Sequence, residues 1–189
     1  APGRVKDRTV RLNGRRPRGA GGLYPWSLGM GSGWYRVVVA HETANTFSVY
    51  SVSSSDGTLT EIAGSPFPTG ARPVALALSP SGKFLYVASG NLPLVFGYSV
   101  AAGTGSLAAV PNSPFSVGNG PRSLVVDPSE HFLYVTNFSD NTVSGLTLNS
   151  TSGTLTAALA SPVPAGPGPI SVTASANALS VTGLGPGNG

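Results

Sequence analysis

The chain contains SPFPTG at residues 65–70, and similar stretches follow at residues 113–118 (SPFSVG) and 161–166 (SPVPAG), each 48 residues after the one before. A second landmark keeps the same step, because GTLT at residues 57–60 returns in similar form at residues 105–108 and 153–156. A fixed period of this length indicates a stack of similar supersecondary units. The structure of one unit therefore decides the fold.

Each unit is predicted to hold four short strands joined by tight turns. In the clearest unit we expect strands at Arg122–Asp127, Phe132–Asn137, Val143–Leu148 and Leu155–Leu159, because these runs are rich in β-branched and apolar residues and turn residues separate them. Four such strands in succession form an antiparallel meander.

The neighbouring units repeat this pattern, with less of it at the two ends. We expect an opening strand to be absent from the first unit and the last unit to have a first strand and a less certain second. The expected strands are Tyr35–Ala40, Thr46–Val52 and Leu59–Ile62 in the first unit, Pro73–Leu78, Phe84–Ser89, Val95–Val100 and Leu107–Val110 in the second, and Ile170–Ala174 in the last.

The strands carry apolar residues on both pleat faces, as in SLVV at residues 123–126 and FLYV at residues 132–135. Apolar residues on both pleat faces are typical of a strand in a sheet that is covered on both sides. A two-layer sandwich predicts cleaner alternation, and a solenoid predicts a shorter coil or a helix in each repeat. The predicted fold is therefore all-β, a β-propeller with four-stranded antiparallel blades.

Composition divides the chain into three parts. Residues 1–33 are rich in Arg and Gly and lack hydrophobic periodicity, residues 34–182 form the predicted partial propeller, and residues 183–189 are a Gly-rich tail. The first part has two interpretations: a basic arm that touches nucleic acid or anionic lipid, or a disordered leader.

The charge distribution argues against nucleic acid as a partner of the repeats. The net charge is +4, but eight of the eleven basic residues precede Val37, and from there on three basic residues stand against six acidic ones. Such a surface does not suit a phosphate backbone. There is no cysteine for a disulfide or a thiolate metal site, no apolar run long enough to span a bilayer, and no cofactor motif.

One unit also resembles a known family. The sequence GPRSLVVDPS at residues 120–129, followed by FLYVTN at residues 132–137, is similar to the YVTN repeat of the lactonase, 6-phosphogluconolactonase-like family. Residues 70–73 and 79–88 are similar again, whereas the WD-repeat signature is missing. The resemblance implies a fragment of about three blades from a ring of normally seven. It implies a parent activity, the hydrolysis of a sugar-acid lactone such as 6-phosphogluconolactone.

Strand alternation predicts where a site lies. In a four-stranded meander the loop into the first strand and the loop between the second and third strands fall on one rim, near the central channel where propellers bind ligands. One rim is predicted to carry His41, Glu42, Arg72, Arg122 and Asn137, and the other Asp56, Lys83 and His131.

The family pattern is only partly kept at these positions. In lactonase-type relatives the first strand starts with Pro-Arg-His and the second ends in Val-Asn-Glu. Here Ser123 stands where the His would be, Asn137 matches the Asn, and Phe138 replaces the Glu. The first unit keeps an acidic residue there, Glu42, and in the second unit Arg72 lies one place earlier relative to its strand.

Lactone opening requires a base to activate water and cations or N–H groups to bind the oxyanion and the substrate's acidic group. On this hypothesis Glu42 is the base, His41 assists it, and Arg72, Arg122 and Asn137 bind the substrate. The structural alternative is that Glu42 caps its loop and the arginines brace loop carbonyls.

A second class of function is open from the sequence: a non-catalytic propeller that binds a protein or a glycan. The enzyme would suit the cytoplasm and the binding module an extracytoplasmic surface. Three blades also leave sheet edges and apolar faces open at both ends, which invites self-association, and two copies could approximate one ring.

Overall fold

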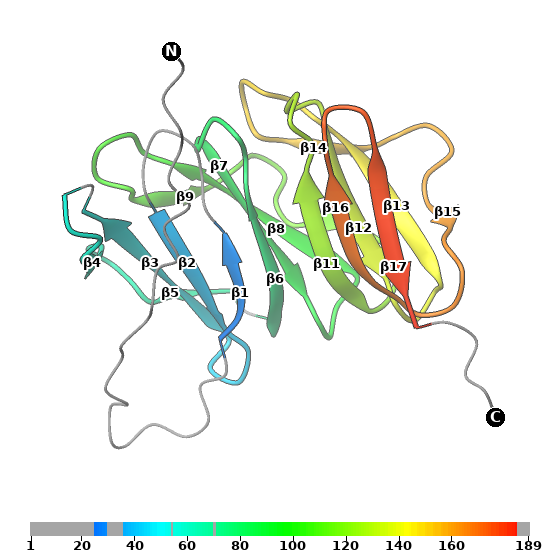
Figure 1. The fold of residues 1–189 in the computed structure, drawn as a ribbon, viewed down its shortest axis with the longest axis horizontal. Coiled ribbons are helices and arrows are strands. Elements are labelled where there is room, and N and C mark those ends of the chain that lie inside the picture. Colours follow the sequence, from blue (N-terminus) through cyan, green and yellow to red (C-terminus); the bar gives the residue numbers. More distant parts are fainter. Residues whose placement is uncertain (1–24, 30–35, 54, 70, 185–189) are drawn as a thin grey trace, which may run out of the picture.

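The structure, a computed structural model, describes residues 25–29, 36–53, 55–69 and 71–184. All regular elements in these ranges are β-strands, and they form four antiparallel sheets that lie side by side (Figure 1). The predicted all-β class is confirmed. Within the same ranges there is no helix long and apolar enough to cross a membrane.

The first three sheets, called blades 1 to 3 here, have one plan, and two strands of a fourth sheet follow them. Blade 1 contains β1 (Pro25–Gly29), β2 (Arg36–His41), β3 (Thr46–Val52), β4 (Leu59–Glu61) and β5 (Phe67–Pro68). Blade 2 contains β6 (Pro73–Leu78), β7 (Phe84–Ser89), β8 (Leu94–Val100), β9 (Leu107–Ala109) and β10 (Phe115–Ser116). Blade 3 contains β11 (Pro121–Val126), β12 (Phe132–Asn137), β13 (Thr142–Leu148), β14 (Leu155–Ala157) and β15 (Val163–Pro164), and the fourth sheet contains β16 (Pro169–Ala174) and β17 (Leu179–Gly183).

The predicted strands are confirmed, with ends that differ by at most two residues. The prediction that the first unit lacks an opening strand is wrong, because β1 pairs antiparallel with β2. Residues 25–29, with the sequence PWSLG, fall in the predicted leader, which lacks hydrophobic periodicity. A weak strand former can still pair when a neighbour offers a row of unpaired N–H and C=O groups. Residues 1–24 and 30–33 of the predicted basic arm lie outside the described residues.

The repeated Ser-Pro stretch has a defined structural task. In each copy the Ser-Pro peptide bond is cis, and the residues after it form the short strands β5, β10 and β15, which pair with the start of the third strand. The serine hydroxyls of Ser65, Ser113 and Ser161 accept hydrogen bonds from third-strand N–H groups at 3.1, 2.9 and 2.8 Å. The motif thus splits the outer edge of each blade in two and satisfies the backbone donor left at the break.

Side chains from alternate pleat faces fill two cores, one between blades 1 and 2 and one between blades 2 and 3. In β7, Leu85 and Val87 belong to the first core, whereas Phe84 and Tyr86 belong to the second. All four are at most 4% exposed, which confirms that both faces of the sheet are covered.

The first strands of successive sheets lie next to one another. β6 packs against both β1 and β11, and β11 packs against β16. Figure 1 shows the sheets fanning out from these neighbouring strands in an open array. This is the arrangement of a partial propeller, with the first strand of each blade innermost.

Candidate functional site

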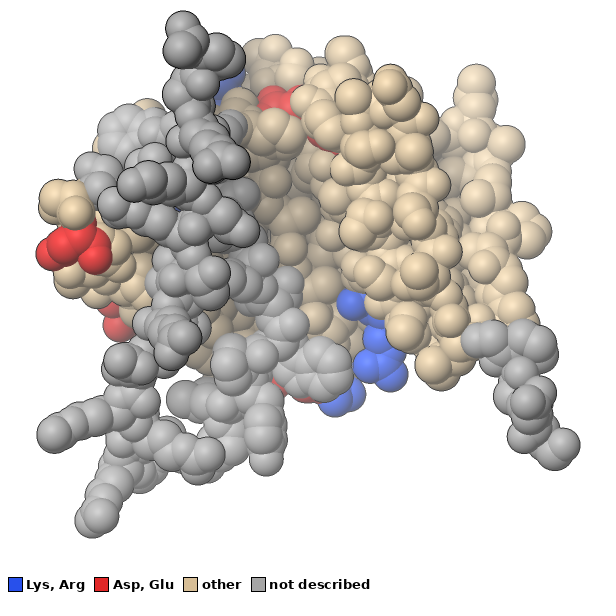
Figure 2. All heavy atoms as spheres, in the orientation of Figure 1, with Lys and Arg blue, Asp and Glu red and all other residues tan. Residues whose placement is uncertain are grey.

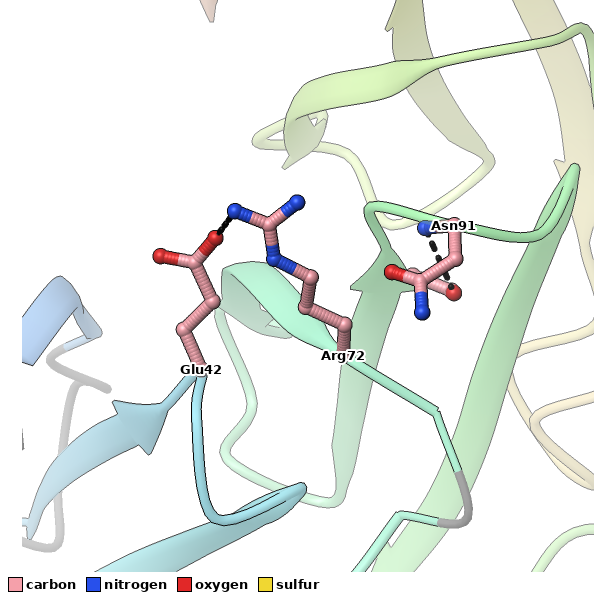
Figure 3. Close-up of polar contacts among 4 residues, drawn as sticks. Glu42, Arg72 and Asn91 are labelled. Carbon is pink, nitrogen blue, oxygen red and sulfur yellow. Dashed lines mark hydrogen bonds and ion pairs between the residues drawn. The ribbon is translucent and has the colours of Figure 1, made fainter.

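The predicted rim brings Glu42 and Arg72 together across the junction of blades 1 and 2. Glu42 follows the last residue of β2, and Arg72 immediately precedes β6. Their side chains point toward one another, and Arg72 Nη2 forms an ion pair with Glu42 Oε1 (Figure 3). One carboxylate oxygen is turned to the guanidinium and the other is turned away from it.

The two partners differ in their access to solvent. The side chain of Glu42 is 10% exposed and that of Arg72 is 50% exposed. Glu42 is hidden because it continues the pleat face of Val38 and Ala40, which is buried against blade 2. Hiding a carboxylate is unfavourable unless a cation or several N–H groups accompany it, and here Arg72 does so.

His41 does not join this pair, because it lies on the opposite pleat face of β2. Its Nε2 lies 2.9 Å from Ser48 Oγ, and its Nδ1 is buried and has no hydrogen-bond partner among the described residues. Burial lowers the pKa of His41, and the negative charge of Glu61 acts in the other direction. A neutral imidazole held by Ser48 cannot assist Glu42 directly in this arrangement.

Arg122 and Asn137 lie on blade 3. The Arg122 guanidinium stacks over the Phe138 ring, 5.2 Å from its centroid. Asn137 is completely buried, its Nδ2 donates to Thr142 Oγ1 at 3.0 Å and to Ser144 Oγ at 2.8 Å, and its Oδ1 has no partner in the described part of the chain. Such burial suits a residue that positions the rim better than one that touches a ligand.

The strand register shows why the two arginines differ. Pro73 pairs with Ser89 and Pro121 pairs with Asn137, so these prolines are equivalent. Arg72 precedes the first proline and Arg122 follows the second, so the two arginines differ by two positions of the repeat. The predicted difference of one position is therefore wrong.

The same slot between neighbouring blades is occupied differently at each junction. Glu42 faces Arg72 at the first junction, and the equivalent residues at the second are Gly90 and Gly120. At the third, the equivalents are Phe138 and Gly168, where a Cβ added to the glycine would lie 3.1 Å from the phenylalanine ring. Of the three junctions that the structure describes, only the first therefore carries an acid–base pair, and at the third Phe138 lies beside Gly168 and under the Arg122 guanidinium.

Sequence reasoning missed Asn91, which lies on the same rim in the loop after β7 (Figure 3). Its N–H donates to Ser89 Oγ at 3.3 Å, and its amide side chain is exposed. The available signal was its position, one residue beyond the equivalent of Glu42.

Asp56 lies in the β3–β4 turn and His131 in the β11–β12 turn, so these two residues and Lys83 share the rim opposite to Glu42, as strand alternation predicts. Lys83 lies in the turn between β6 and β7, beside Arg36 at the start of β2 and Ala102 in the turn after β8. Charged side chains are sparse on the face shown in Figure 2 and gather toward its edges. Within the described residues there is no group of three or more His, Cys, Asp or Glu side chains that could hold a metal ion.

The repeats and the open fan of blades agree with one family. Residues 33–174 match the model of the family described as "Lactonase, 7-bladed beta-propeller". The chain belongs to this lactonase family. No curated protein matches this lactonase-family chain.

Solved structures show the same fold at low sequence identity. A provisional 6-phosphogluconolactonase of Bacteroides uniformis superposes with a TM-score of 0.71 at 16% identity, over 84% of this chain and 47% of its own length. The periplasmic gluconolactonase PpgL of Pseudomonas aeruginosa superposes with a TM-score of 0.60 at 22% identity, over 80% of this chain and 40% of its own length. An auxiliary nutrient binding protein of Bacteroides ovatus superposes with a TM-score of 0.55 at 18% identity, over 78% of this chain and 42% of its own length. The lactonase-family chain thus spans less than half the length of these structures.

Proposed function

We propose that the rim at the junction of blades 1 and 2 binds a sugar-acid lactone and hydrolyses it. The observation that carries this proposal is the Glu42–Arg72 pair, in which a largely hidden carboxylate lies beside a half-exposed guanidinium. Membership of the lactonase family and the likeness to a gluconolactonase support the same reaction class.

The reaction needs few groups. The carboxylate oxygen of Glu42 that is turned away from Arg72 takes a proton from a water molecule, and the water oxygen adds to the lactone carbonyl carbon. Arg72 stabilises the negative charge that develops on the carbonyl oxygen. The bond between the carbonyl carbon and the ring oxygen then breaks, and the ring oxygen receives the proton from Glu42. The product is the open hydroxy acid.

Arg122 supplies a second cation for the acidic group of the substrate. Its guanidinium stacks on Phe138 and forms no ion pair with a carboxylate of the described residues, so it can bind a substrate anion. An arginine held flat on an aromatic ring presents its outer N–H groups to a phosphate or carboxylate in a fixed orientation. In this proposal Asn137 orients the rim from beneath, and His41 does not take part.

Continuous titration of released acid tests the proposal, with 6-phosphogluconolactone and glucono-lactone as substrates and the spontaneous rate subtracted. Glu42→Gln keeps the shape of the side chain, and we expect it to lower kcat by about 10²–10⁴-fold, as for loss of a general base. Arg72→Gln should lower kcat/KM by about 10–100-fold, because it removes a charge-assisted hydrogen bond.

Asp56→Asn is the matched control, because Asp56 is an exposed carboxylate in the β3–β4 turn of the other rim, and its activity should equal that of the unaltered chain. Full activity in Glu42→Gln would remove Glu42 as the base and with it the proposed site.

Ligand binding without turnover is the second candidate function. Ser123 and Phe138 stand where lactonase-type repeats have His and Glu, so two positions of the family pattern lack acid–base groups. Calorimetric titration with the open sugar acid and with neutral glycans distinguishes the two. Saturable binding by a chain that hydrolyses neither lactone would favour the binding module.

A further inference from the structure

The outer face of blade 3 carries an apolar groove of about 470 Å³ beside β17. Phe132, Tyr134, Val143, Ala158 and Val163 form its blade 3 wall, and Leu179 and Val181 of β17 form the other. Several of these side chains are open to solvent, since Phe132 is 38%, Val163 46% and Leu179 42% exposed. A contiguous apolar surface of this kind marks an interaction site.

The repeat shows what normally covers such a surface. The residues one repeat earlier than the blade 3 wall are Phe84, Tyr86, Val95, Val110 and Phe115, and each of them is buried. Between blades 2 and 3 these five side chains pack in one core with residues of β11 and β12 and with Leu146, Leu148 and Leu155 of β13 and β14.

The junction between blades 1 and 2 is packed in the same way. Phe47, Ile62 and Phe67 of blade 1 pack with Leu85 and Val87 of β7. The third and fourth strands of blade 2 add Tyr98, Val100 and Leu107. At each of these two junctions, the apolar side chains of one blade are covered by two sets of side chains from the next blade. The first set comes from the first and second strands of that blade, and the second set comes from its third and fourth strands.

At the third junction only the first set is present among the described residues. By strand register, Val172, Leu179 and Val181 stand at the positions of Leu124, Leu133 and Val135, because Val172 pairs with Val181 as Leu124 pairs with Val135. Counterparts of Leu146, Leu148 and Leu155 do not occur in the described chain, where the fourth sheet consists of β16 and β17 alone. The groove is the volume that those three side chains fill elsewhere.

A further contact shows what the turn between the third and fourth strands must provide. Tyr86 Oη donates to the carbonyl of Gly153 in the β13–β14 turn at 2.7 Å, and a Cβ added to Gly153 would lie 2.4 Å from Phe84 Cδ1. Tyr134 and Phe132 are the equivalents of Tyr86 and Phe84. An occupant therefore needs a glycine at its turn, so that the backbone passes under Phe132 and offers a carbonyl to the Tyr134 hydroxyl, which has no hydrogen-bond partner among the described residues.

From this geometry we propose that the groove binds an uncharged, amphipathic β-hairpin, which adds to the edge of β17 that pairs with no described strand, as the third and fourth strands of that sheet. Its first strand carries two groove-facing apolar residues two positions apart, its turn carries a glycine, and a leucine follows two residues after that glycine. Strand addition satisfies the β17 backbone while the side chains fill the groove.

A synthetic peptide with the sequence of residues 142–157 of this chain is the probe, because it contains the β13–β14 hairpin with the required pattern. Fluorescence anisotropy of the labelled peptide with the full chain should give saturable one-to-one binding. The peptide changes Leu148→Asp and Gly153→Val should each weaken binding about tenfold or more, because one buries a charge in the groove and the other blocks passage under Phe132.

Val163→Asp in the protein places a charge in the groove at a residue that is 46% exposed, so the fold should tolerate it, and peptide binding should fall about tenfold or more. Leu92→Asp is the matched control, because Leu92 is 41% exposed in the β7–β8 loop and does not line the groove, and binding should be unchanged. Binding that persists in Val163→Asp would overturn the proposal, since the peptide would then be bound elsewhere.

A tethered form covers the case of weak affinity. Fusing the same hairpin after Gly189 through a Gly/Ser linker raises its effective concentration to about the millimolar range. The fusion should raise Tm, and the fusion carrying Leu148→Asp in the added hairpin should not. Absence of both binding and stabilisation would overturn the proposal. So would a concentration-dependent dimer in sedimentation velocity that Val163→Asp abolishes while no hairpin binds, because the occupant would then be a second copy of the chain.

Discussion

Replacing Arg36, which is buried at the junction of blades 1 and 2, should stabilise the folded chain. Arg36 is 6% exposed and stands where the next two repeats have Phe84 and Phe132. A Cβ added to Gly105 would lie 1.5 Å from Arg36 Nη1, just as one added to Gly153 would lie 2.4 Å from the Phe84 ring. Arginine thus occupies a slot shaped for an aromatic ring.

The guanidinium is poorly satisfied in this slot. Nη2 reaches the carbonyl of Gly103 at 3.5 Å, and Nη1 is buried with no hydrogen-bond partner among the described residues. Burial lowers the pKa of Arg36, because the low-dielectric junction disfavours its positive charge. A buried N–H left without an acceptor costs about 1–3 kcal/mol.

Arg36→Phe removes that cost and adds an aromatic side chain, whose full burial contributes roughly 1.5–3 kcal/mol. The arginine stem already buries part of the same area, so about 2–3 kcal/mol of net stabilisation is expected. For a domain of this size that raises Tm by about 4–10 °C.

Urea unfolding followed by circular dichroism measures the change directly, and a thermal scan checks it. Lys83→Met is the control for loss of positive charge alone, because Lys83 lies beside Arg36 but is exposed, and its effect should stay within about 0.5 kcal/mol. An Arg36→Phe chain that is no more stable than the unaltered one would refute the assignment of this slot as an aromatic position of the repeat.

Three further predictions each concern one residue. Ser113→Ala should lower the free energy of unfolding by about 1–3 kcal/mol, because it leaves the buried Gly97 N–H without an acceptor, whereas Ser106→Ala in the exposed β8–β9 turn should have little effect in the same urea titration. Ala160→Gly should raise stability by up to about 1 kcal/mol, because Ala160 has a φ of 60° where glycine is unstrained, and a loss on urea unfolding would contradict this. Burial holds the pKa of His41 in the folded chain below 6.5, so its contribution to stability is full above that pH and is lost as the pH falls from 6.5 toward the folded pKa. His41→Asn should flatten this decline below pH 6.5, and an unchanged profile of urea unfolding against pH would show that another group is responsible.

The sequence predicted most of the strands because the signals that define them are local. β3, β6, β7 and β12 begin and end at the predicted residues, since each is a run of β-branched and apolar residues bounded by turn residues. β1 was missed because its residues carry no such signal and it forms by pairing with β2. The repeat also placed Glu42 and Arg72 on one rim from alternation alone.

The rest of the candidate site depended on which pleat face each side chain takes at a blade junction. His41 and Glu42 are neighbours in the sequence, yet one faces Ser48 and the other faces Arg72, because successive strand residues point to opposite faces. The full burial of Asn137 follows from its contacts with Thr142 and Ser144 within blade 3, and no motif distinguishes a buried asparagine from a ligand-binding one.

The sequence by itself determined the period, the four-strand unit and the two-sided burial of each sheet, because these are properties of residues close together in the chain. Only the tertiary structure decided what meets across each junction: an ion pair at Glu42, an arginine in an aromatic slot at Arg36, and an open groove beside Tyr134. The physical reason is that each of these contacts joins side chains from successive blades, so its geometry depends on how the blades pack against one another.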